Sequence, residues 1–186
     1  DRRATGMLER GDFERYKKGV PAVTNDGLPP GTCPISELFI DRYFELTPTF
    51  SGEMDFKCFV DFTLHVEFLP AKCHRPGLFF DIFDLDGDGI ITPTDIQSFF
   101  RETRAKLVAA GLQDTVPVEL FVREVFDALE PAESLKCTRE EFVRSRAAGI
   151  VAGTVIDPLA FFAYDSRDND VGAKQQSLYR YEQPLR

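Results

Sequence analysis

The chain has 186 residues, of which 43% are hydrophobic, and this is enough apolar material for a folded core. Its 31 acidic and 22 basic residues give a formal net charge of −9, which argues against nucleic acid or an anionic membrane as the main partner. No apolar stretch reaches the roughly 18 residues that cross a bilayer, so we expect no membrane span. The chain begins with Asp1 rather than Met, and we expect it to be a fragment of a longer protein.

The first predicted element is a degenerate EF-hand loop at residues 1–12. An EF-hand holds Ca²⁺ in a twelve-residue loop between two helices, with oxygen ligands at alternate positions and Gly at position 6. Asp1, Gly6 and Asp12 fit this register, but Arg3 places a cation at a ligand position. Because one cation repels another, we expect metal binding here to be largely lost.

A second degenerate loop is predicted at residues 47–58. Gly52 and Met54 preserve the turn and the apolar position 8, but Thr and Ser stand where carboxylates are needed. Apolar residues at helical spacing flank this loop, with Ile35, Leu38, Phe39 and Leu46 before it and Phe56, Phe59, Val60 and Leu64 after it.

The strongest signal is an intact EF-hand loop at residues 84–95. It combines carboxylates at positions 1, 3 and 5 with Gly89 at position 6, which permits the sharp turn. Helical stripes flank it, with Leu78, Phe79, Ile82 and Phe83 before and Ile96, Phe99, Phe100 and Leu107 after. The predicted metal ligands are Asp84, Asp86, Asp88, the carbonyl of Ile90, Thr92 and Asp95.

Asp95 departs from the usual EF-hand pattern, because position 12 normally carries a Glu that chelates Ca²⁺ with both oxygens. The shorter Asp side chain supplies one oxygen unless the loop contracts. We therefore expect weaker Ca²⁺ binding, with a Kd on the order of 10⁻⁶ to 10⁻⁴ M, and more tolerance of Mg²⁺.

The fourth loop, residues 130–141, is predicted to preserve the EF-hand shape without its metal chemistry. A helical stripe precedes it, and Pro, Ala, Leu and Lys occupy positions where ligands or the Gly are needed. Thr138 and Glu141 have the spacing of a capping box, which begins a further helix. Position 8 of this loop is Cys137, which we expect to lie opposite Ile91.

These loops predict an all-α fold, an EF-hand array of two pairs with short β-bridges between paired loops. The expected division is residues 1–74 for the first pair and 75–163 for the second pair with a C-terminal packing segment. Residues 164–186 are expected to form a polar tail.

Catalytic and cofactor-binding residues are not predicted. The chain has only two His and no Gly-rich phosphate-binding loop, which leaves little for acid–base or nucleophilic chemistry. The four Cys do not have metal-finger spacing, and we read them as reduced thiols. A zinc site at His65, Cys73 and His74 is an alternative, but a helix end with an unbound thiol is the favoured interpretation.

A family resemblance rests on the stretches at residues 52–62, 83–89, 95–101, 124–131 and 153–161. In this order they resemble the C-terminal half of the B″ regulatory subunits of protein phosphatase 2A, in the branch of the B″ gamma and plant TONNEAU/FASS-type subunits. The resemblance covers about residues 5–169. The last two stretches make it specific, since the EF-hand motif alone is common.

The resemblance implies a non-enzymatic, Ca²⁺-binding subunit that binds the phosphatase scaffold and catalytic subunits and directs them to substrates. It also implies a cytoplasmic location, with a link to the centrosome or cytoskeleton and to cell division. The metal ligands carry over at Asp84, Asp86, Asp88, Ile90, Thr92 and Asp95. Two alternatives remain open: a free-standing Ca²⁺ sensor that binds a helical peptide in a Phe-lined groove, and a structural EF-hand scaffold with constitutive Mg²⁺ or Ca²⁺.

Overall fold

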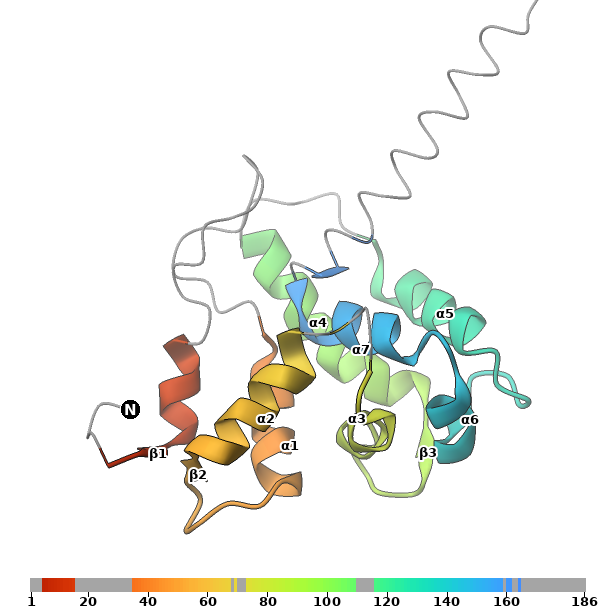
Figure 1. Ribbon diagram of the computed structural model, residues 1–186. Coiled ribbons are helices and arrows are strands. Elements are labelled where there is room, and N and C mark those ends of the chain that lie inside the picture. Colours follow the sequence, from red (N-terminus) through yellow and green to blue (C-terminus); the bar gives the residue numbers. More distant parts are fainter. Residues whose placement is uncertain are drawn as a thin grey trace, which may run out of the picture.

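A computed structural model describes residues 5–15, 35–67, 69, 73–109, 116–158, 160, 161 and 164. Within these residues the chain is mainly helical, as the all-α prediction requires (Figure 1). The α-helices are α1 (Glu37–Leu46), α2 (Phe56–Glu67), α3 (Pro76–Phe83), α4 (Pro93–Ala109), α5 (Val118–Leu129), α6 (Arg139–Arg144) and α7 (Ala148–Ile156). A 3₁₀ helix, η1 (Arg10–Arg15), precedes them.

Short antiparallel strands join the EF-hand loops in pairs, which confirms the predicted array. Strand β1 (Met7–Leu8) pairs with β2 (Met54–Asp55), so position 8 of the first loop, Leu8, lies opposite Met54. Strand β3 (Ile90–Ile91) pairs with β4 (Cys137–Thr138), and Ile91 lies opposite Cys137 as predicted. The division at residues 74 and 163 stays a prediction, and the tail beyond Tyr164 lies outside the described residues.

Phenylalanine rings fill one continuous core. Phe13 packs edge-on against Phe62 with ring centroids 4.9 Å apart, and Phe100 stacks on Phe121 at 3.8 Å. These rings and their neighbours are almost entirely buried. The Phe-rich composition therefore serves packing within the described residues, with edge-to-face and stacked pairs that add to the burial of apolar area.

The predicted apolar stripe on α2 is wrong for three of its four residues, and only Phe59 packs against the core. Phe62 and Val66 are buried, whereas three residues of the predicted stripe are exposed, by 73%, 38% and 45% respectively: Phe56, Val60 and Leu64. Phe62 packs against Phe13 of η1 and Tyr43 of α1, with ring centroids 4.9 and 5.0 Å apart, and these contacts place its side of α2 in the core. The sequence pattern of α2 allows either face, since apolar residues lie on both.

The two EF-hand pairs pack against each other through α1 and α3. Phe39 of α1 stacks on Phe79 of α3 with ring centroids 6.0 Å apart and planes 6° from parallel. Helix α7 packs on α3, α4, α5 and α6, and its Ile156 carbonyl accepts a hydrogen bond of 2.8 Å from the Ser36 N–H before α1 (Figure 1). None of the helices in the described part of the chain is long and apolar enough to cross a membrane.

Candidate metal centre

The loop at residues 84–95 connects α3 to α4 and contains β3. The stripes predicted for both flanking helices are buried, which anchors the two ends of the loop in the core. Gly87 and Gly89 have positive φ angles of 73° and 85°, a backbone conformation that side chains with a Cβ disfavour. The chain can therefore turn back tightly and bring successive side chains to one side.

Asp84 is the buried centre of this turn, with 7% of its surface exposed. Its carboxylate accepts backbone hydrogen bonds from the N–H groups of Gly87, Asp88 and Gly89, at 2.9, 3.2 and 2.9 Å. A buried carboxylate is costly unless it is hydrogen-bonded, and these three donors offset that cost. The loop is thus organised around the first predicted ligand.

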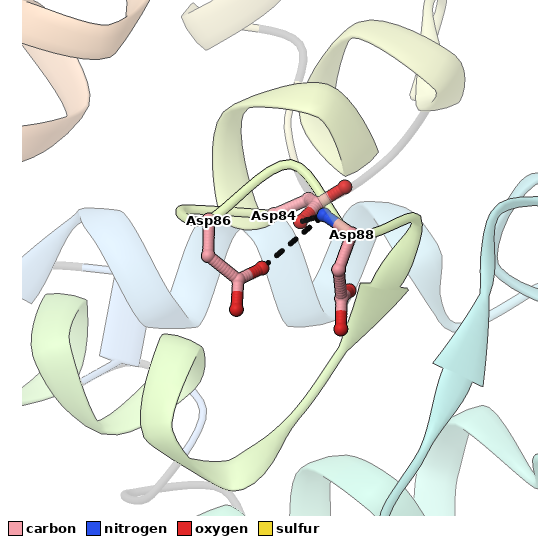
Figure 2. Close-up of side chains that lie close together, drawn as sticks. All are labelled: Asp84, Asp86 and Asp88. Carbon is pink, nitrogen blue, oxygen red and sulfur yellow. Dashed lines mark hydrogen bonds between the residues drawn. The ribbon is translucent and has the colours of Figure 1, made fainter.

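Asp84, Asp86 and Asp88 gather their carboxylates on one side of the turn (Figure 2). One oxygen from each lies within 4.8 Å of the others. Asp86 and Asp88 are exposed, so an ion can reach the group from solvent. Three carboxylates at this separation repel one another, and hard cations such as Ca²⁺ and Mg²⁺ bind oxygen donors of this kind. The residues present fit a divalent cation.

Asp95 closes the loop, but its carboxylate lies outside the group of three. Its Oδ2 accepts hydrogen bonds from the Thr92 N–H at 2.8 Å and the Thr92 hydroxyl at 2.6 Å. Its Oδ1 accepts a longer one, 3.4 Å, from the Leu85 N–H. The structure therefore brings three of the predicted side-chain ligands together and holds Thr92 and Asp95 as a separate pair at the start of α4.

Backbone hydrogen bonds close the middle of the two fully described degenerate loops. In loop 47–58 the backbones of Phe50 and Glu53 exchange hydrogen bonds of 2.8 and 3.0 Å, and in loop 130–141 the Lys136 N–H donates to the Glu133 carbonyl at 3.1 Å. Both contacts join positions 4 and 7 of their loops. Backbone pairing therefore holds the middle of each loop, and the loss of metal binding there stays a prediction.

Glu141 secures the fourth loop from position 12. It accepts hydrogen bonds from the N–H groups of Ala132 and Thr138, at 2.9 and 2.8 Å, and the capping box with Thr138 is complete. These donors hold the pKa of the Glu141 carboxyl below its ordinary value. Asp95 at position 12 of loop 84–95 is held in the same way, by the N–H groups of Leu85 and Thr92.

The alternative zinc site receives no support from the described residues. The Asp group is the only cluster of His, Cys, Asp or Glu in the described part of the chain that could hold a metal. His65 instead forms a hydrogen bond of 2.8 Å between its Nδ1 and the Tyr43 hydroxyl. Cys58, Cys73 and Cys137 are free thiols, and Cys33 lies outside the described residues.

Arg42 is a neighbour of the loop that sequence reasoning missed. From α1 its guanidinium donates hydrogen bonds to the carbonyls of Asp81 and Asp84, at 3.0 and 3.1 Å. Nothing in the local pattern could have revealed it, since 42 residues separate Arg42 from Asp84.

Comparison with curated proteins identifies the relatives of this chain. The human B″ gamma regulatory subunit of protein phosphatase 2A is 28% identical over 168 residues, which cover 90% of this chain and 34% of that relative. The Arabidopsis thaliana B″ subunit TON2 is 33% identical over 178 residues, which cover 91% of this chain and 33% of the relative. The chain is a homologue of B″ regulatory subunits. The resemblance predicted from the sequence is confirmed.

The B″ homologue spans about a third of the length of these curated relatives. A third relative, the Caenorhabditis elegans protein phosphatase 2A regulatory subunit rsa-1, is 26% identical over 178 residues, or 90% of this chain and 38% of rsa-1. All three are named as regulatory subunits rather than as catalytic ones. No protein-family profile matches the chain.

A solved structure supports the fold. A chain in a PP2A PR70 holoenzyme aligns with the B″ homologue at a TM-score of 0.67 and 23% identity, covering 85% of this chain and 53% of that chain. At this identity the likeness concerns architecture, and it agrees with the EF-hand pairing described above.

Proposed function

We propose that this B″ homologue is a Ca²⁺-binding regulatory subunit of protein phosphatase 2A. In this role it binds the scaffold and catalytic subunits and directs them to substrates, without catalysing a reaction itself. The proposal includes a cytoplasmic location and a link to the centrosome or cytoskeleton and to cell division. Residues 1–74 and 75–163 act as its two EF-hand units.

The observation that carries the Ca²⁺ response is the group of Asp84, Asp86 and Asp88 in the intact loop. The proposed ligand set adds the Ile90 carbonyl, Thr92 and Asp95. A divalent ion supplies the positive charge that offsets the repulsion among the carboxylates. Mg²⁺ competes with Ca²⁺ because the loop ends in Asp95 rather than Glu.

Size-exclusion chromatography with purified phosphatase scaffold subunit tests the proposal. The wild-type chain is expected to co-elute in Mg²⁺, and added Ca²⁺ is expected to increase the bound fraction. Asp84→Ala is expected to weaken the Ca²⁺-dependent part, because it removes both a ligand and the acceptor for three loop N–H groups. Asp127→Ala is the matched control, since it removes the same charge from the exposed face of α5.

The result separates the parts of the proposal. If neither Ca²⁺ nor Asp84→Ala changes the co-eluting fraction, the adaptor role is supported and the proposed Ca²⁺ response is refuted. A chain that binds no scaffold in either metal, while Ca²⁺ induces strong binding of an apolar dye, favours the free-standing sensor instead.

A further inference from the structure

Helix α1 belongs to the first EF-hand pair, yet it contacts both helices that flank the candidate metal loop. It packs against α3, which leads into the loop, and against α4, which leads out of it. The stacked rings of Phe39 and Phe79 form the apolar part of the α1–α3 contact. Figure 1 shows α1 between α2 and α3, with β1 and β2 on one side of it and β3 on the other.

Arg42 ties α1 to the end of α3. Its guanidinium donates to the Asp81 and Asp84 carbonyls at 3.0 and 3.1 Å, with a longer contact of 3.5 Å to the Ile82 carbonyl. The last carbonyls of a helix have no partner within it, and they favour a nearby cation. The last turn of α3 carries no basic residue, so the cation that meets its carbonyls comes from the other EF-hand pair.

Glu102 ties α4 to the start of α1. Its carboxylate accepts hydrogen bonds from the Ser36 hydroxyl at 2.7 Å and from the N–H groups of Glu37 and Leu38 at 2.6 and 3.2 Å. The first N–H groups of a helix need an outside acceptor, and a carboxylate suits them because of its charge. Lys106 joins the contact, 2.8 Å from Glu102 and 2.6 Å from the Ile35 carbonyl.

The Glu102 contact is strong enough to keep a half-buried carboxyl ionised. Burial by itself raises the pKa of Glu102. The Glu37 N–H, the Lys106 ammonium and the Ser36 hydroxyl outweigh burial and leave the pKa of Glu102 below its ordinary value. Helix α1 is thus held by charge-assisted hydrogen bonds from the helices on both sides of the metal loop.

We propose that α1 transmits the metal state of loop 84–95 to the first EF-hand pair, with Arg42 and Glu102 as the positioning residues. The inference rests on the proposed metal site. Metal binding changes the angle between the two helices of sensor EF-hands. Because hydrogen bonds tolerate only small changes in length, movement of α3 against α4 either carries α1 with it or breaks its contacts.

Amide hydrogen exchange on the 186-residue chain, in Ca²⁺ and in EDTA, tests the proposal. In the wild type, exchange across Glu37–Leu46 is expected to be about tenfold slower in Ca²⁺, the size of effect that one charge-assisted hydrogen bond supports. Arg42→Gln and Glu102→Gln are each expected to remove most of this difference while loop 84–95 still slows in Ca²⁺. The two variants act at different helices, so a folding defect in one, seen by circular dichroism, leaves the other as the test.

Arg139→Gln is the matched control. Arg139 of α6 donates to the Asp81 carboxylate at 3.0 Å, so it binds the same turn of α3 from within the second pair. This variant is expected to retain the α1 response. If it abolishes the response as fully as Arg42→Gln, the proposal is overturned, because general loosening of α3 then explains the effect.

The remaining outcomes distinguish the inference from the function beneath it. If loop 84–95 slows in Ca²⁺ but α1 exchanges at the same rate in Ca²⁺ and EDTA, the transmission is absent and the metal site stands. If neither segment responds, the proposed metal site and the inference both fall.

Discussion

Asp95 closes the metal loop with a side chain one carbon shorter than the Glu usual at this position. Its Oδ2 is held by the backbone and hydroxyl of Thr92. Asp95→Glu is expected to tighten Ca²⁺ binding on the order of tenfold and to reduce Mg²⁺ competition, because the longer side chain can reach the ion with both oxygens. Isothermal titration with each metal measures both effects.

Asp127→Glu makes the same change on the exposed face of α5 and is expected to leave metal affinity unchanged. An Asp95→Glu chain with unaltered Ca²⁺ affinity would show that position 12 does not limit binding. The close placement of Asp84, Asp86 and Asp88 was predictable, because their spacing lies within one loop, and their role as metal ligands stays a prediction. The pairing of Asp95 with Thr92 is local as well, because the two residues stand three apart at the start of α4, as Thr138 and Glu141 do at the start of α6.

Among the elements, the fourth loop shares one feature with loop 84–95, a position-12 carboxylate that accepts backbone hydrogen bonds. The Glu141 carboxylate receives the Ala132 and Thr138 N–H groups that an ion would otherwise help to organise. Glu141→Ala is expected to lower the free energy of unfolding, because it removes the carboxylate that accepts the Ala132 and Thr138 N–H groups and completes the capping box. Because no ion is involved, the loss is expected to be equal in Ca²⁺ and in EDTA.

Urea unfolding of Glu141→Ala in both conditions checks this expectation. Glu140→Ala, at the exposed neighbouring position on α6, is the control and is expected to change stability little. A loss that appears only in Ca²⁺ would contradict the metal-free description of loop 130–141. The capping box itself was predicted from sequence, because Thr138 and Glu141 interact across three residues.

For the whole molecule, the buried contact between α1 and α2 makes stability depend on pH. His65 is 8% exposed and lies 2.8 Å from the Tyr43 hydroxyl. Burial lowers the pKa of His65 below 6.5, and nearby Arg75 lowers it further, while Asp61 opposes the shift and His74 adds a smaller lowering. The unfolded chain therefore takes up this proton before the folded one does.

Stability from this group is fully present above about pH 6.5 and is lost as the pH falls from there toward the folded pKa. Urea unfolding in EDTA is expected to show a lower free energy of unfolding at about pH 5.5 than at about pH 7.5. His65→Gln retains an acceptor for Tyr43 and is expected to flatten this loss. His74→Gln, at an exposed position, is expected to retain it; equal slopes for wild type and His65→Gln would refute the assignment.

The sequence by itself determined the class of fold, the register of the loops and the close placement of Asp84, Asp86 and Asp88. These features are local, because ligands, turn glycines and helix stripes repeat at fixed short spacings. They can therefore be predicted without knowledge of long-range contacts. Only the tertiary structure decided that Phe62 of α2 faces the protein core while Phe56 faces solvent. It also decided that Arg42 and Glu102 connect α1 to the helices on either side of loop 84–95. Contacts between residues 42 and 65 positions apart arise only when the two EF-hand pairs pack together, and no local pattern encodes that packing.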